Sequence, residues 1–189
     1  MDFEEDLKKS LRVLKEGGII LYPTDTLWGL GCDATSPSAV QKIFRIKSRT
    51  DSKSLIILVN GESMVERYVK NIPETAFQIT GISDKPVTII YPEGKNLAPG
   101  VCSEDGSVGI RICNDPFCNE LITRFRKPIV STSANLSGKP APAHFGDIDQ
   151  GIINAADFVV KYRQKDRQKH TASPVIKIDN NGVFKILRM

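Results

Sequence analysis

The stretch YPTDTLWGLGCD, residues 22–33, follows a short apolar run at 19–22 that has the character of a buried strand ended by Pro23. Its threonines, Thr24 and Thr26, offer hydroxyls, and its two glycines let the backbone turn tightly beside a ligand. Polar loops directly after buried strands are where α/β proteins usually bring donors to a ligand. A single Gly-x-Gly is weak evidence, and no GxxxxGKS or GxxxxGKT sequence indicates a P-loop. By itself the stretch predicts a structured loop, with ligand binding as one alternative.

A basic segment, KSRTDSKS at residues 47–54, leads into the next predicted strand. Side chains two positions apart in an extended stretch point to the same side, so Lys47 and Arg49 would form a cationic pair. Such a pair suits a polyphosphate or a carboxylate, since a guanidinium can bind two oxygens at once. A solvated basic surface is the alternative, because several cations gather here: Lys42, Arg45, Lys47, Arg49 and Lys53.

A third polar segment, STSANLSG at residues 131–138, continues a short apolar strand at 129–131. Ser131 and Ser133 alternate, so both would face one side together with Asn135. Hydroxyl and amide groups in this arrangement suit phosphate oxygens or a small polar substrate, although ordinary turn chemistry also explains them.

The composition predicts one domain over residues 1–189, because a chain of this length with 40% hydrophobic residues supports one substantial core. A net charge of +4 fits binding of phosphates or nucleic acid, but also fits proteins that bind neither. The four cysteines form no CxxC pair and the two histidines lie far from them in sequence, so we expect buried free thiols rather than a zinc or redox site.

Hydrophobic periodicity and capping residues predict a mixed α/β fold, a twisted sheet covered by helices. Two helices carry an N-cap followed by proline, at Ser36–Pro37 and Asp115–Pro116. Helices are predicted at 2–16, 36–46, 62–69, 74–81, 115–126 and 147–155. Strands are predicted at 19–22, 55–59, 87–91, 107–112, 129–131, 158–160, 174–178 and 183–187.

The sequence also predicts a cytoplasmic protein without a membrane anchor. Its first ten residues, MDFEEDLKKS, are acidic and lack the apolar run of a secretory signal. No stretch reaches the roughly 18 apolar residues that are needed to cross a bilayer.

In combination, the three segments are far more specific than each one alone. PTDT-x-x-GLG, then K-x-R, then V-x-IRI and finally STSANLSG resemble the YrdC-like family of threonylcarbamoyl-AMP synthases over residues 17–186. The resemblance implies an α/β YrdC-like fold around a concave basic cleft. It also implies the conversion of L-threonine, bicarbonate and ATP to threonylcarbamoyl-adenylate and pyrophosphate.

Site residues follow from the resemblance, position by position. It implies threonine contacts by Thr26, Arg111, Ser131 and Ser173. It implies ATP contacts by Lys47, Arg49, Lys53, Ser107, Ser133, Asn135, Ala141 and Arg188, with Lys47 and Arg49 as the catalytic cations.

The implied chemistry joins two anions, a carbamate and a triphosphate. Fixed positive charge from the protein, and Mg²⁺ carried mainly by the ATP phosphates, would stabilise the charge of the transition state. No Ser/His/Asp or Cys/His arrangement suggests a covalent nucleophile. The resemblance further implies tRNA or double-stranded RNA as a possible partner, modification of tRNA at position 37, and a downstream threonylcarbamoyl transferase complex.

Three departures from the family pattern leave an alternative open. Thr50 replaces a common proline, Leu58 replaces a histidine of some members, and DKPVTII at 84–90 replaces a Trp-Pro-Gly-Pro element. The alternative is an RNA-binding module of the related YciO-like branch, without synthase activity.

Overall fold

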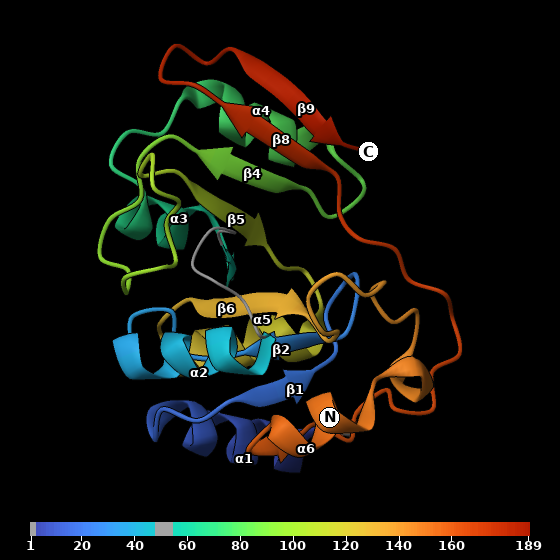
Figure 1. Ribbon diagram of the computed structural model, residues 1–189. Helices are drawn as coiled ribbons and strands as arrows, with labels where there is room; N and C mark the ends of the chain where they lie inside the picture. The colour runs from blue at the N-terminus through green and yellow to red at the C-terminus, as the bar shows by residue number, and fades with distance from the viewer. Residues whose placement is uncertain (1–2, 48–54) are drawn as a thin grey trace.

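The computed structural model describes residues 3–47 and 55–189, and it confirms the predicted α/β fold with a mixed sheet and helices (Figure 1). The helices are α1 (Glu4–Lys15), α2 (Pro37–Lys47), α3 (Glu62–Tyr68), α4 (Glu74–Ile82), α5 (Pro116–Phe125) and α6 (Gln150–Ala155), with a 3₁₀ turn, η1, at Phe145–Asp147. The strands are β1 (Ile20–Tyr22), β2 (Gly29–Gly31), β3 (Ile56–Val59), β4 (Thr88–Tyr91), β5 (Val108–Ile112), β6 (Ile129–Ser133), β7 (Phe158–Val159), β8 (Val175–Ile178) and β9 (Phe184–Arg188).

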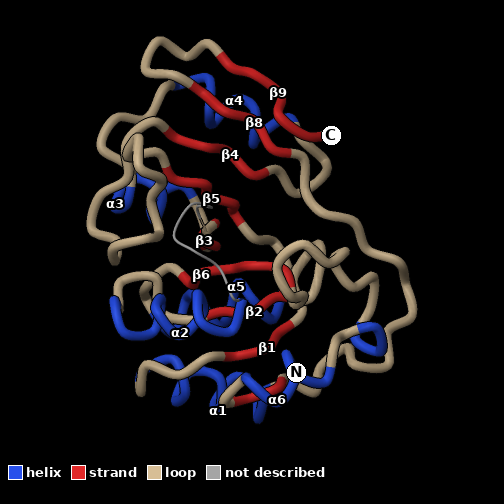
Figure 2. Tube along the Cα trace, viewed as in Figure 1, coloured by secondary structure: helices blue, strands red, loops and turns tan. Residues whose placement is uncertain are grey.

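The described strands form one nine-stranded sheet in the order β7-β1-β2-β6-β3-β5-β4-β8-β9 (Figure 2). The pairs β1/β7, β3/β5 and β4/β8 are parallel, and the other neighbours are antiparallel. A long connection from β7 to β8 runs from the β1 end of the sheet to the β9 end, along the right side of the view in Figure 1. Residues far apart in the sequence therefore meet near the middle of the sheet.

Every predicted helix and strand has a counterpart, with ends shifted by a few residues. One strand was not predicted, because β2 lies inside the stretch expected to be a loop. The N-caps are confirmed: the Asp115 carboxylate accepts a hydrogen bond from Cys118 N at 3.0 Å, and the Ser36 hydroxyl accepts one from Ala39 N at 3.4 Å. These caps fix where α2 and α5 begin.

The structure confirms that α1 is amphipathic. Leu7 and Leu14 on its apolar face are each 1% exposed, and α1 packs against α5. Burial of side chains this size contributes about 1.5–3 kcal/mol each to folding.

All four cysteines are free thiols, three of them buried, with Cys102 partly exposed. In the described part of the chain, no helix combines the length and the apolar character that a bilayer crossing needs. The prediction of one domain over 1–189 stays a prediction.

Candidate functional site

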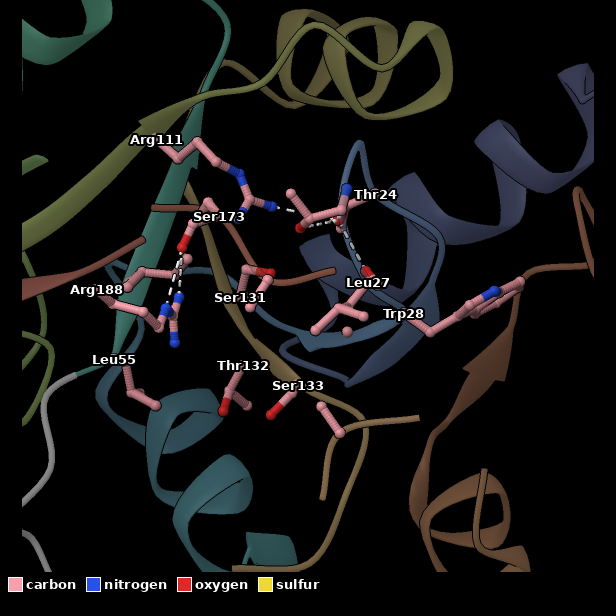
Figure 3. Close-up of a pocket in the computed structure, with 15 residues that line it drawn as sticks. Thr24, Leu27, Trp28, Leu55, Arg111, Ser131, Thr132, Ser133, Ser173 and Arg188 are labelled. Atoms are coloured by element: carbon pink, nitrogen blue, oxygen red, sulfur yellow. Dashed lines mark hydrogen bonds between the residues drawn. The ribbon is translucent and has the colours of Figure 1, made fainter. Parts of the chain in front are cut away.

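A cavity of about 260 Å³ opens near the middle of the sheet, between the β1–β2 side and the β8–β9 side (Figure 3). Hydroxyl groups and two guanidinium groups line it together with apolar side chains. The lining residues are Thr24, Thr26, Leu27, Trp28, Gly29, Leu55, Ile56, Arg111, Ser131, Thr132, Ser133, Ala141, Ala172, Ser173 and Arg188. Its chemistry suits a small, anionic, hydrogen-bonding ligand.

Arg111, on β5, is the central cation of the cavity and is only 4% exposed. Its guanidinium donates to Thr24 Oγ1 at 3.2 Å and to Ser173 Oγ at 3.4 Å, as Figure 3 shows for Thr24. Asp25 Oδ1 lies 3.0 Å from Nη2 and supplies the opposite charge, with its side chain 9% exposed. A buried guanidinium held in this way is preorganised to receive a carboxylate or phosphate oxygen.

The loop after β1 is folded by its own threonines. The hydroxyl of Thr24 donates to Leu27 O at 2.8 Å and accepts from Thr26 N at 3.1 Å. The hydroxyls of Thr24 and Thr26 lie 3.1 Å apart. Such local bonds from Thr to backbone compete with regular structure, so the chain turns here and both hydroxyls remain at the cavity wall.

The two glycines of the stretch 22–33 lie in β2 rather than in turns, which corrects the prediction of a tight loop. A Cβ on Gly29 would approach Ser131 Oγ to 3.1 Å, and one on Gly31 would approach the Tyr22 ring to 2.6 Å. Glycine therefore lets β2 lie close to the neighbouring side chains, and it keeps the Ser131 hydroxyl in place beside the cavity.

Lys47 is the last residue of α2 and is fully buried, not part of an extended segment as predicted. Its ammonium donates to Ser133 O at 2.6 Å, to Asn135 Oδ1 at 3.0 Å and to Asn135 O. The hydroxyl of Ser133 also donates to Asn135 Oδ1. This Lys47–Ser133–Asn135 cluster, called the lysine clasp below, ties the polar end of β6 to the end of α2.

Arg188, near the C-terminal end of β9, reaches back to the same cavity. Its guanidinium donates to Ser173 O from Nε at 3.1 Å and from Nη2 at 2.7 Å. The Ser173 hydroxyl in turn lies 2.7 Å from Thr88 Oγ1 on β4. Arg188 and β4 therefore fix both the backbone and the side chain of Ser173.

The structure brings together seven of the residues that sequence reasoning placed in the site. Around the cavity are Thr26, Arg111, Ser131, Ser133, Ala141, Ser173 and Arg188. Lys47 and Asn135 join them through the lysine clasp. Arg49 and Lys53 lie outside the described residues, as does the departure at Thr50.

Ser107 does not line this cavity. Its hydroxyl donates to Asp105 Oδ1 at 2.6 Å, and its backbone N–H donates to the same oxygen at 3.0 Å. These bonds, with a further one from Lys177, lower the pKa of Asp105 to about 2. The predicted contact of Ser107 with the nucleotide stays a prediction. In this structure the Ser107 hydroxyl is bonded within the turn before β5.

Several features of the cavity were not assigned from the sequence. Thr24 was recognised only as a hydroxyl, although its contact with Arg111 makes it part of the site. The Asp25 ion pair carried no sequence signal, and neither did the apolar lining by Trp28. Leu58, where some family members have a histidine, is fully buried beside Arg111 in the β3/β5 register.

No protein-held metal site is evident in residues 3–47 and 55–189, where no three His, Cys, Asp or Glu side chains are grouped to bind an ion. The polar side chains around the cavity carry hydroxyl and guanidinium groups.

Comparison with known proteins gives a consistent result for nearly the whole chain. The family Sua5_yciO_yrdC, described as "Telomere recombination", matches residues 12–189. The threonylcarbamoyl-AMP synthase of Psychromonas ingrahamii is 38% identical over 141 residues, which cover 73% of this chain and 74% of that protein.

Two solved structures share the fold. P. abyssi Sua5 complexed with L-threonine superposes with a TM-score of 0.86 at 25% identity, and the match covers 98% of this chain and 54% of that one. The present chain therefore spans about half the length of that Sua5 chain. E. coli YciO matches with a TM-score of 0.83 at 20% identity, over 97% of this chain and 88% of YciO, and this likeness concerns the fold alone.

Proposed function

The chain belongs to the Sua5/YciO/YrdC family, and from this premise we propose that it is a threonylcarbamoyl-AMP synthase. The proposed reaction joins L-threonine, bicarbonate and ATP into threonylcarbamoyl-adenylate and pyrophosphate. The observation that carries it is the cavity itself, where polar residues from segments far apart in sequence surround one buried arginine. The 38% identity to a curated synthase supports the same reaction.

In this proposal threonine occupies the side of the cavity around Arg111. Its carboxylate accepts hydrogen bonds from the guanidinium, and its hydroxyl and amine find partners among Thr26, Ser131 and Ser173. The burial of Arg111 supports this assignment, because an ion pair with a ligand carboxylate is much stronger away from water. Trp28 and Leu55, the residue before β3, supply the apolar part of the wall.

ATP occupies the adjoining side in the proposal, near Ser133, Asn135, Ala141 and Arg188. The three donors of the Lys47 ammonium have protein acceptors in this structure, so we assign Lys47 first to holding the Ser133–Asn135 loop in shape. Arg49 and Lys53 remain proposed phosphate ligands on the strength of the family resemblance. Mg²⁺ enters as part of the substrate, bound to the ATP phosphates.

The chemical step follows from these positions. The threonine nitrogen forms a bond to the carbon of carbon dioxide, derived from bicarbonate, and loses a proton, which leaves a carbamate. A carbamate oxygen then bonds to the α-phosphorus while the bond from that phosphorus to the β-phosphate oxygen breaks, and pyrophosphate leaves. Holding the two anions together is the main task of the protein, so positioning and fixed positive charge supply most of the rate enhancement. The product would pass to a threonylcarbamoyl transferase complex that acts on tRNA.

The experiment that tests the proposal measures pyrophosphate release from ATP, with threonine, bicarbonate and Mg²⁺ omitted in turn. Release is expected only when all are present, and a chelator should stop it. Release that continues without threonine would contradict the proposal. A folded protein that releases none and binds RNA in a salt-dependent way would favour the RNA-binding alternative instead.

A further inference from the structure

Arg163 lies outside the cavity but contacts the segments that form it. It sits in the β7–β8 connection with φ at 62°, a left-handed conformation that is uncommon for a residue other than glycine. The preceding backbone is firmly held, because Asp6 Oδ2 accepts from Lys161 N and from Tyr162 N at 2.8 Å each. The Tyr162 ring also packs against Phe3, with 4.9 Å between the ring centroids. The residue keeps this conformation between a firmly held backbone and the contacts of its own guanidinium.

The Arg163 guanidinium joins three segments of the chain. It donates from Nη1 to Thr24 O at 3.1 Å and to Asp115 Oδ2 at 3.0 Å, at the cap of α5. It also pairs with Asp166 Oδ2 at 3.3 Å. Its Nη2 lies 3.0 Å from His170 Nε2, and that ring nitrogen lies 3.3 Å from Asp166 Oδ2.

These contacts reach one wall of the cavity directly, through Thr24 O, and the other only through the chain that leads from His170 to Ser173. Thr24 belongs to one wall, and Ser173 belongs to the other and follows His170 by three residues. Inside the cavity, Arg111 joins the same two walls through Thr24 Oγ1 and Ser173 Oγ. Arg163 thus links the Thr24 wall to the segment that carries Ser173, at a place outside the cavity, whereas Arg111 contacts both residues inside it.

We infer that Arg163 is a positioning residue that sets the distance between the Thr24 and Ser173 walls and so determines affinity for the amino-acid substrate. The inference rests on the proposed function for the identity of that substrate. Arg163 does not line the cavity, so its effect is expected through geometry rather than through ligand contact. A displacement of about 1 Å in such a wall is enough to reduce rates by orders of magnitude.

The test compares Arg163→Met with Arg163→Lys, and uses Arg167→Met as the control that removes the same charge from an exposed side chain of the same connection. For Arg163→Met we expect the KM for threonine to rise by about tenfold or more, while the KM for ATP changes less than about twofold. Arg163→Lys should lie in between, because an ammonium retains the charge but not the fork of donors. Equal changes in both KM values, or wild-type kinetics in Arg163→Met, would overturn the inference.

A second readout does not depend on turnover. Amide hydrogen exchange in Arg163→Met should accelerate in peptides covering 23–28 and 170–174, but stay unchanged in those peptides for Arg167→Met. Wild-type protein without threonine-dependent release would refute the proposed function, and exchange would still decide the role of Arg163. Unchanged hydrogen exchange at both walls in Arg163→Met would overturn the inference that Arg163 positions them.

Discussion

Replacing Lys47 with methionine is expected to reduce turnover by at least about 100-fold, because the lysine clasp holds the loop on which Ser133 and Asn135 lie. Methionine is similar in length but cannot donate, so the partly buried acceptors at Ser133 O and Asn135 lose their partner. The loss of stability is expected to be roughly 3 kcal/mol, which corresponds to a Tm lower by about 6–12 °C. Steady-state pyrophosphate release and thermal unfolding measure the two effects.

Lys42→Met is the matched control for Lys47. It lies on the same helix, is exposed, and donates to Gly17 O at 2.9 Å. Turnover of this variant should remain within about twofold of wild type, since exposed polar contacts contribute little. If Lys47→Met retained wild-type turnover, the clasp would not be needed for the reaction, and the assignment of this end of the cavity would be wrong.

Replacing Arg111 with methionine should have the second large effect, on threonine use. The value of kcat/KM for threonine is expected to fall by at least about 100-fold, since a buried charge-assisted contact to the carboxylate is lost. The free energy of unfolding of this variant should also be lower by about 3–5 kcal/mol, because Asp25 stays buried without its cation. Initial rates at varied threonine and urea unfolding measure both.

The double variant Arg111→Met/Asp25→Asn separates these effects. It removes both charges, so a large part of the lost stability should return while threonine use stays impaired. Recovery of threonine use in the double variant would mean that Arg111 matters only as the partner of Asp25. That result would remove the guanidinium from the proposed substrate contacts.

The sequence predicted the elements well because each carried a local signal. The apolar spacing of α1 and the Asp115 cap of α5 act within a few residues, and the structure confirms both. Strand β2 escaped prediction because Gly-x-Gly has no side-chain pattern and little strand propensity. Its pairing with β1 and β6, not its own residues, makes it a strand.

The site was predictable only as far as motif resemblance reached. Seven motif residues do meet at the cavity, although nothing local in the sequence places Arg188 beside Ser173. The Asp25–Arg111 pair and the Arg163–Thr24 contact join residues 86 and 139 positions apart, which no spacing rule detects. For Lys47 the local pattern was misleading. It predicted an extended backbone, whereas in the structure α2 continues through Lys47, whose side chain is held by tertiary contacts. A concave basic cleft stays a prediction.

Identification of the product by mass spectrometry, with ¹³C-labelled bicarbonate, ATP and threonine, tests the central claim most directly. We predict a species with the mass of threonylcarbamoyl-AMP that gains one mass unit from the label and is absent without threonine. Its yield should fall steeply in Arg111→Met. ATP consumption that yields only AMP or ADP without label, or a product that forms without threonine, would contradict the proposed function.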